Sequence, residues 1–276
     1  MRIIKIFENI NCTKMLLELK DGYIIENCFK YPFWMCITTQ VGCPVGCTFC
    51  YSGKNGFKRN LTKEEMMEQV RIAIRYSMGS FSYERMFLNI SFTGMGEPLL
   101  NSDNVFETIQ EIQNNSDAEI SLTTTGMSEK LQILFFTRRK IALDISLHSV
   151  DSIKRQTLIP MESKQPIEET IRFVLKYIKK FKTVTFDYLL LKGVNDSKED
   201  LELLINLLKE TKVHLELKKY NKTDVTDGFD SAEDEVFKYF VDEFIKNGIS
   251  VSVEENVGLE FNAGCGQLVW SYSENK

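Results

Sequence analysis

Three cysteines near residue 45 have the types and spacing needed to hold iron. Cys43, Cys47 and Cys50 follow a C-x3-C-x2-C pattern, and the glycines and proline between them allow the loop to bend. A [4Fe–4S] cube normally takes four thiolates. Three thiolates on one short loop would leave one iron open to a ligand that the protein does not supply. The motif therefore predicts an iron–sulfur cluster with an open coordination position.

A structural zinc site is the alternative for the same cysteines. Structural zinc prefers paired C-x2-C units that are completed by a fourth Cys or His. This chain offers one C-x2-C unit, and its two histidines, His148 and His214, are remote from that unit in the sequence. Ligand number and spacing therefore favour the cluster over zinc.

The segments that must position this loop alternate between strands and helices. Residues 34–41 have strand character and run into the cysteine loop, and Thr62 with Glu65 forms a capping box that predicts a helix start. Further strands are predicted at 87–92, 119–123, 141–147, 184–191, 213–217 and 249–253, with helical stretches between them. This alternation is typical of βαβ units. We therefore predict an α/β fold, an open partial (β/α)6 TIM-like barrel.

The chain is predicted to have two parts. Residues 1–33 form a short N-terminal β extension with a hairpin at Asp21-Gly22, and residues 34–276 form the barrel. Active sites of such barrels lie at the carboxyl ends of the strands. Any one polar segment there, taken alone, is better explained as a turn or a helix cap. Several of them beside a cysteine loop predict a ligand-binding rim, at residues 93–98, 123–126, 146–148 and 192–196.

Composition restricts the possible classes of function. The 276 residues carry a formal net charge of -5, which is not typical of a strong nucleic-acid binder. No apolar run reaches membrane-spanning length, and the first residues lack the apolar run of a signal peptide. Thiolates that hold a cluster need a reducing compartment. We therefore expect a cytoplasmic protein with no membrane partner.

Phe49 lies directly before Cys50, the last cysteine of the motif. With this aromatic residue, the C-x3-C-x2-C motif resembles the cluster-binding motif of radical S-adenosylmethionine (SAM) enzymes. Four further segments extend the likeness: GMGEPLLN from Gly94, SLH from Ser146, LLKGVNDS from Leu190 and AGCGQL from Ala263. Together they resemble the RlmN/Cfr family of radical SAM RNA methyl synthases. The resemblance implies a radical SAM barrel in a short form without the family's N-terminal accessory domain. It also implies a [4Fe–4S] cluster, SAM, and an electron donor such as flavodoxin or ferredoxin.

The resemblance further implies roles for individual residues. One SAM would methylate Cys265, and a radical from a second SAM would activate that methyl group to add to C2 or C8 of an adenine in rRNA or tRNA. Cys36 would then resolve the adduct by forming a disulfide, and Glu26 matches the proposed base. The implied cluster ligands are Cys43, Cys47 and Cys50, and the implied SAM contacts are Gly96, Glu97, Thr123, Ser146, Leu147, His148 and Asn195.

The residues themselves leave some roles open. Cys265 between two glycines indicates a reactive thiol, Cys36 is either a thiol near the cluster or a core residue, and Cys12 and Cys28 are interpreted as structural. Six basic residues either form a small phosphate-binding patch or are solvated: Lys54, Lys58, Arg59, Lys218, Lys219 and Lys222. Glu254 and Glu255 would repel phosphate where the family is rich in arginine. The alternative function is therefore the same two-SAM chemistry on a nucleotide, metabolite or peptide.

Overall fold

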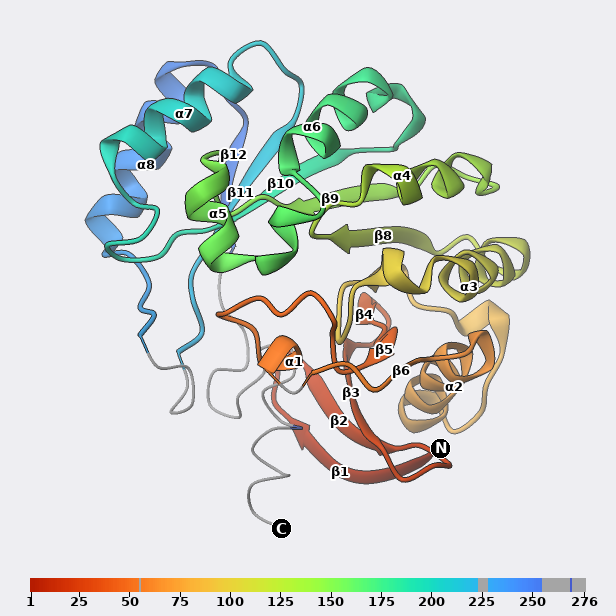
Figure 1. Ribbon diagram of the computed structural model, residues 1–276. Coiled ribbons are helices and arrows are strands. Elements are labelled where there is room, and N and C mark those ends of the chain that lie inside the picture. The colour runs from red at the N-terminus through yellow and green to blue at the C-terminus, as the bar shows by residue number, and fades with distance from the viewer. Residues whose placement is uncertain (55, 223–227, 255–268, 270–276) are drawn as a thin grey trace.

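One sheet of ten strands forms the frame of the protein, seen here in a computed structural model that describes residues 1–54, 56–222, 228–254 and 269. The strand order is β1-β2-β3-β4-β7-β8-β9-β10-β11-β12. Figure 1 shows the sheet curving from β1 to β12, with the larger helices against its outer side. No helix in the described ranges has both the length and the apolar character needed to cross a bilayer.

Seven strands of this sheet, from β4 to β12, run parallel to one another. Helices lie between them in the chain, so the predicted βαβ pattern and the α/β partial barrel are confirmed. The seven strands are β4 (Trp34–Cys36), β7 (Asn89–Phe92), β8 (Glu119–Thr124), β9 (Ala142–Ser146), β10 (Val184–Leu189), β11 (His214–Lys218) and β12 (Val251–Glu254).

The N-terminal extension consists of three antiparallel strands, β1 (Arg2–Glu8), β2 (Thr13–Glu18) and β3 (Ile24–Lys30). The predicted turn joins β2 to β3: the Leu19 amide donates to the Tyr23 carbonyl at 2.8 Å, and Gly22 has φ +87°. Because β3 also pairs with β4, the extension continues the barrel sheet.

The helices begin where the sequence provides caps. Thr62 and Glu65 form the predicted capping box, in which the Glu65 amide donates to Thr62 Oγ1 at 3.2 Å. The α-helices are α1 (Tyr51–Lys54), α2 (Lys63–Met78), α3 (Ser102–Asn115), α4 (Ser128–Leu131), α5 (Ser152–Leu158), α6 (Ile167–Lys176), α7 (Lys198–Leu208) and α8 (Asp234–Lys246). Short 3-10 helices span Tyr83–Arg85, Pro98–Asn101, Gln132–Phe136, Pro160–Ser163 and Ile178–Lys180.

The segment 34–41, predicted as one strand, is divided into β4 and the two-residue β5 (Gln40–Val41), which pairs with β6 (Arg59–Asn60). Between them the backbone leaves the sheet. The Thr38 amide donates to Gln69 Oε1 at 2.9 Å, and the Thr39 amide donates to the Met95 carbonyl at 2.8 Å. This bend directs the chain into the cysteine loop.

The two faces of the sheet differ in polarity, because side chains of a strand alternate between them. The outer face carries buried apolar residues such as Ile90, Leu122 and Phe186, which belong to the hydrophobic core. The inner face carries polar or sulfur-containing residues, and it lines a cavity with Cys28, Cys36, Thr123, Ser146, Asp187 and Lys218. The strands therefore present their reactive groups inward.

Candidate active site

Two adjoining cavities, of about 430 Å³ and about 130 Å³, lie at the carboxyl ends of the parallel strands. They share the residues Phe49, Cys50, Thr93, Thr123, Ser146 and His148. The larger cavity extends toward the N-terminal strands, and the smaller one faces the cysteine loop. This is the end of the barrel at which the sequence predicted a ligand-binding rim.

The three cysteines of the loop line the smaller cavity. Burial raises the pKa of Cys43 to about 12, with a further contribution from Cys50, and burial also raises the pKa of Cys47. Buried thiolates that repel one another need a cationic partner. In the described part of the chain no three Cys, His, Asp or Glu side chains converge on a single ion. The three cysteines on one cavity wall are the donors that the predicted cluster would use.

Glu97 is a buried carboxylate at the wall of the smaller cavity. Its Oε1 accepts from Thr124 Oγ1 at 2.6 Å, and its Oε2 accepts from the Thr125 amide at 2.9 Å. Burial nevertheless raises its pKa. At the preceding residue, Gly96, φ is +106° and a Cβ would lie 2.7 Å from Gln40 Cβ. The loop after β7 is therefore closely held against both the end of β8 and the entry to the cysteine loop.

His148 lies at the boundary of the two cavities in a left-handed conformation, φ 55°. Its Nδ1 accepts from the Leu189 amide at 3.0 Å, which assigns the ring proton to Nε2. Burial lowers the pKa of His148 to about 3, and Arg155 and Lys218 add to this effect. The Phe49 ring meets the imidazole edge to face at 5.1 Å. His148 is thus a neutral hydrogen-bond donor at the boundary.

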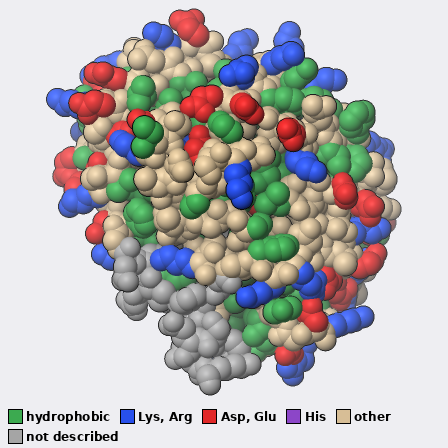
Figure 2. Space-filling view, viewed as in Figure 1, with side chains coloured by type: hydrophobic (Ala, Val, Ile, Leu, Met, Phe, Trp, Pro, Cys, Tyr) green, Lys and Arg blue, Asp and Glu red, His purple; other side chains and the backbone are tan. Residues whose placement is uncertain are grey.

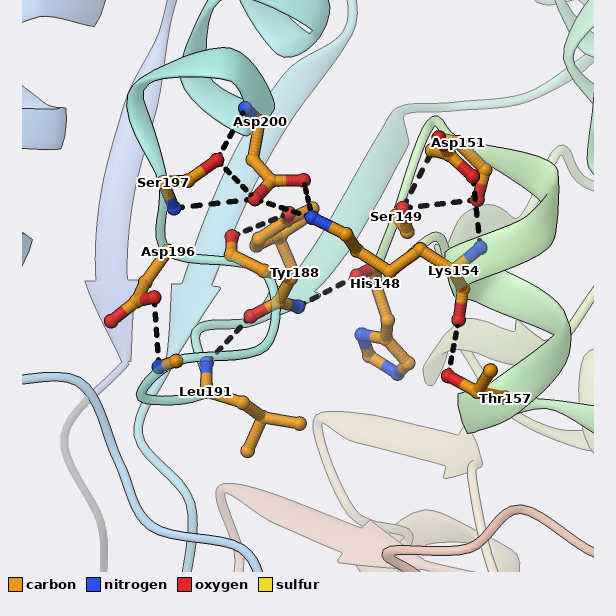
Figure 3. A network of polar contacts seen from close by, with 12 residues as sticks. His148, Ser149, Asp151, Lys154, Thr157, Tyr188, Leu191, Asp196, Ser197 and Asp200 are labelled. Carbon is orange, nitrogen blue, oxygen red and sulfur yellow. Dashed lines mark hydrogen bonds and ion pairs between the residues drawn. The ribbon is translucent and has the colours of Figure 1, made fainter.

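Two predicted SAM contacts, Asn195 and Leu147, do not line either cavity. Asn195 Nδ2 donates to the His148 carbonyl at 2.7 Å, and its Oδ1 accepts from the Leu191 amide at 2.7 Å. Figure 3 shows His148, Tyr188 and Leu191 joined in this network behind the rim. Through its side chain Asn195 therefore positions His148.

Arg155 is a residue of the site that the sequence did not indicate. Its side chain is fully buried and forms an ion pair with Glu162. The guanidinium also donates to the carbonyls of Thr125 at 2.6 Å, Ser146 at 2.9 Å and Leu147 at 2.8 Å. It therefore joins the ends of β8 and β9. In the sequence Arg155 resembles any charged residue of a short surface helix, so no local signal would have found it.

The predicted resolving thiol and base lie on the wall of the larger cavity. Burial raises the pKa of Cys36 to about 11. Glu26 pairs with Lys14 at 2.9 Å, with side chains only 5% and 2% exposed, and its Oε1 accepts from the Val269 amide at 2.7 Å. Both carboxylate oxygens are therefore bound. Cys265 lies outside the described residues.

Most of the six basic residues considered for a phosphate patch bind acids of the same chain. Lys218 lies in the larger cavity and contacts Glu254 at 2.7 Å and Glu216 at 2.8 Å. Three others are paired on the surface: Arg59 with Asp21 and Glu65, Lys219 with Asp234, and Lys222 with Asp230. Figure 2 shows charges of both signs interspersed over the visible face. These pairs weaken the case for a phosphate patch.

The buried carboxyl group of Asp187, whose Oδ2 lies 3.5 Å from Lys218 Nζ, should make the stability of the protein depend on pH. Burial raises its pKa to about 8, although Lys218 opposes the shift, and its Oδ1 has no hydrogen-bond partner among the described residues. Between its ordinary pKa and pH 8 the folded state holds the extra proton, so the free energy of unfolding should fall as pH rises, by up to about 1.4 kcal/mol per pH unit. Asp187→Asn should reduce this slope in anaerobic urea titrations between pH 5 and 8.

The control for this pH experiment is Asp117→Asn, since the Asp117 side chain is fully exposed. That variant should keep the slope of the wild-type protein. Equal slopes for Asp187→Asn and the wild-type protein would show that Asp187 is ionised in the folded state.

The family follows from comparison with known proteins. Residues 37–208 match the model of the radical SAM superfamily. The probable dual-specificity RNA methyltransferase RlmN of Dictyoglomus turgidum (strain DSM 6724 / Z-1310) is 36% identical over 284 residues, which cover 100% of this chain and 80% of that protein. The chain belongs to the RlmN family of radical SAM enzymes. It is therefore an enzyme of the radical SAM methyltransferase class, and its cofactors are a [4Fe–4S] cluster and SAM.

Other comparisons agree with membership of the RlmN family. The protein of the same name from Petrotoga mobilis (strain DSM 10674 / SJ95) is 36% identical over 266 residues, covering 93% of this chain and 74% of that protein. A radical SAM methyltransferase from Sphaerobacter thermophilus has a similar structure, with TM-score 0.88, 30% identity, and coverage of 96% and 80% of the two chains. Streptococcus suis SuiB bound to S-adenosylmethionine, at 15% identity and TM-score 0.62, shares the fold over 86% of this chain and 56% of its own.

Proposed function

We propose that this protein methylates C2 or C8 of an adenine in rRNA or tRNA, through a methylated Cys265 and two SAM molecules. The position of Cys36 carries the proposal. Its side chain lines the same cavity as Cys50 of the cysteine loop, together with Glu26. A radical SAM enzyme needs only the cysteine loop to hold its cluster, so a further thiol on that cavity wall indicates chemistry with a sulfur-bound intermediate.

The cysteine loop would hold the cluster, which supplies the electron that converts SAM into a carbon radical. Around it, the neutral His148 offers an Nε2–H donor, and the Thr93 and Thr123 hydroxyls, 3.1 Å apart, add polar contacts on the shared wall. The Glu97 carboxylate at the smaller cavity suits the ammonium group of SAM. These groups would bind and orient SAM, while Phe49 and the nearly buried Tyr51 exclude water.

Cys36 and Glu26, which line the larger cavity, would complete the reaction. Once the Cys265 methylene radical has added to adenine, the adduct would lose one electron, for which the oxidised cluster would be the acceptor, and Glu26 would take the proton lost from the ring carbon, beside the Lys14 ammonium. The Cys36 thiolate then attacks the sulfur of Cys265. The sulfur–carbon bond breaks with its electron pair on carbon, that carbon takes up a proton and becomes the methyl group, the methylated adenine leaves, and a Cys36–Cys265 disulfide remains.

A second candidate is the same two-SAM chemistry on a nucleotide, metabolite or peptide. It is favoured by the ion pairs that occupy Arg59, Lys218, Lys219 and Lys222, and by the net charge of -5. For either substrate we propose that a flavodoxin or ferredoxin donates the electron and that the protein works in the cytoplasm.

The test is anaerobic incubation of the cluster-loaded protein with SAM, followed by peptide mass spectrometry of Cys265. We expect a methyl group on Cys265, and 2- or 8-methyladenosine after rRNA and tRNA are added and digested. Unmodified Cys265 in protein that still forms 5'-deoxyadenosine would contradict the proposal. Methylation of free ATP or a peptide, with RNA unmodified, would favour the second candidate.

A further inference from the structure

Besides Cys50 of the cysteine loop, three thiols among the described residues line the larger cavity, although only Cys36 has a proposed role. Cys12, Cys28 and Cys36 all line the larger cavity. The sequence indicated that Cys12 and Cys28 are structural, yet neither faces the apolar side of the sheet. A thiol on the wall of a cavity in which disulfide chemistry is proposed is in a position to take part in it.

Cys28 lies directly opposite Cys36 in the pairing of β3 with β4. Opposed residues of antiparallel strands project to the same face, with Cα atoms about 4.5–5.5 Å apart. A disulfide requires a Cα separation of about 4.4–6.8 Å. The register therefore places Cys28 and Cys36 at a Cα separation within the range of a disulfide.

The surroundings of Cys28 contain two further groups. Cys12 is hydrogen-bonded to the Cys28 side chain, and Lys14 is the residue opposite Cys28 on β2. Cys12 is buried, whereas Cys28 is partly exposed. Of these two thiols, Cys28 is therefore the one that a dissolved reductant can reach.

We propose that Cys28 is a second resolving thiol, which takes over the disulfide left on Cys36 after each turnover. The proposal rests on the proposed function, which supplies that disulfide. The Cys28 thiolate attacks the Cys36 sulfur, the Cys36–Cys265 bond breaks, and the Cys265 thiolate takes up the proton that Cys28 lost. An external dithiol then reduces the Cys28–Cys36 disulfide and is itself oxidised to a disulfide. Cys265 is released when Cys28 attacks Cys36, before the external dithiol acts, and is then available for the next methyl group.

The protonation state of Cys28 agrees with a role late in the catalytic cycle. The hydrogen bond with Cys12 and burial raise its pKa, so the resting thiol is protonated. A protonated thiol is a poor ligand for iron and a poor acceptor of methyl groups, so it does not compete with Cys265. Because the attacking species is the thiolate, the exchange should become faster as pH rises.

The first experiment maps the disulfide after turnover. Cluster-loaded protein is given SAM and total rRNA and tRNA without added thiol, quenched in acid, alkylated and analysed by peptide mass spectrometry. The wild-type protein should contain Cys28–Cys36. Cys28→Ser should retain Cys36–Cys265, and its steady-state rate at low dithiol concentration should fall by roughly ten-fold or more. Cys12→Ser, which removes a neighbouring thiol, should still form Cys28–Cys36.

A second experiment needs no turnover. The cluster-loaded Cys265→Ser variant is equilibrated anaerobically with mixtures of oxidised and reduced dithiothreitol, without SAM or RNA, and its disulfides are mapped. Cys28–Cys36 should form as the mixture becomes more oxidising. If this disulfide does not form, the inference is wrong whatever the first experiment shows.

The two proposals fail in distinguishable ways. Wild-type protein that methylates Cys265 and RNA but retains Cys36–Cys265 refutes only the role of Cys28. Wild-type protein whose Cys265 is never methylated refutes the proposed function, and with it the source of the disulfide that Cys28 would receive.

Discussion

Cys36→Ala should leave the protein covalently joined to its RNA. Without the thiolate on β4, nothing attacks the sulfur of Cys265, so the thioether to adenine cannot be broken. Turnover should fall to background after one cycle, while cleavage of SAM continues, since Cys36 is not among the cysteines of the 43–50 loop. Denaturing gels of labelled RNA should show a band that migrates with the protein and disappears after digestion with protease.

The matched control is the double variant Cys36→Ala/Cys265→Ala, which lacks the sulfur that would be methylated. It should give no adduct and no methylated RNA. Normal multiple turnover by Cys36→Ala would exclude Cys36 as the resolving thiol. An adduct that persists in the double variant would place the covalent bond on another residue.

Arg155→Met should have the largest effect on stability. The change leaves Glu162 as an unpaired buried carboxylate and removes the donors to the carbonyls of Thr125, Ser146 and Leu147. Breaking a buried ion pair on one side typically costs about 3–5 kcal/mol. Anaerobic urea unfolding should show this loss, and SAM binding by the remaining folded protein should weaken because the ends of β8 and β9 are no longer joined.

Two further variants test whether the loss of stability comes from breaking the buried ion pair of Arg155 with Glu162. Arg75→Met removes a half-exposed arginine whose pair with Glu68 lies on the surface, so it should cost no more than about 1 kcal/mol. Arg155→Met/Glu162→Met removes both buried charges and should recover part of the lost stability. If Arg155→Met is no more destabilising than Arg75→Met, the buried network does not hold the rim together.

Features that depend on neighbouring residues could be predicted from the sequence. The capping box of Thr62 and Glu65, the turn at Gly22 and the alternation of strands and helices all formed as expected. The cysteine loop was also recognisable, because its spacing is local. Strand 34–41 was the exception: its division depends on Gln69 and Met95, which bind Thr38 and Thr39 from distant segments.

Features that depend on strand register could not be predicted from the sequence. Lys218 was considered either part of a phosphate-binding patch or a solvated lysine, but the pairing of β11 with β10 and β12 places it among carboxylates inside the barrel. Cys28 faces Cys36 only because β3 pairs with β4 in one particular register. The resemblance implied Asn195 as a SAM contact, whereas its hydrogen bonds to the backbone around His148 could be seen only in the structure.

The strand order also has a consequence for solubility. β1 is the first strand in that order and has a neighbour on one side only among the described strands. An unpaired edge invites other chains to add to the sheet and aggregate. Here Arg2, Lys5 and Glu8 place charges along the edge, and the pairing of β1 is irregular between Ile3 and Lys5. The charged and irregular β1 thus acts as a barrier to intermolecular β pairing.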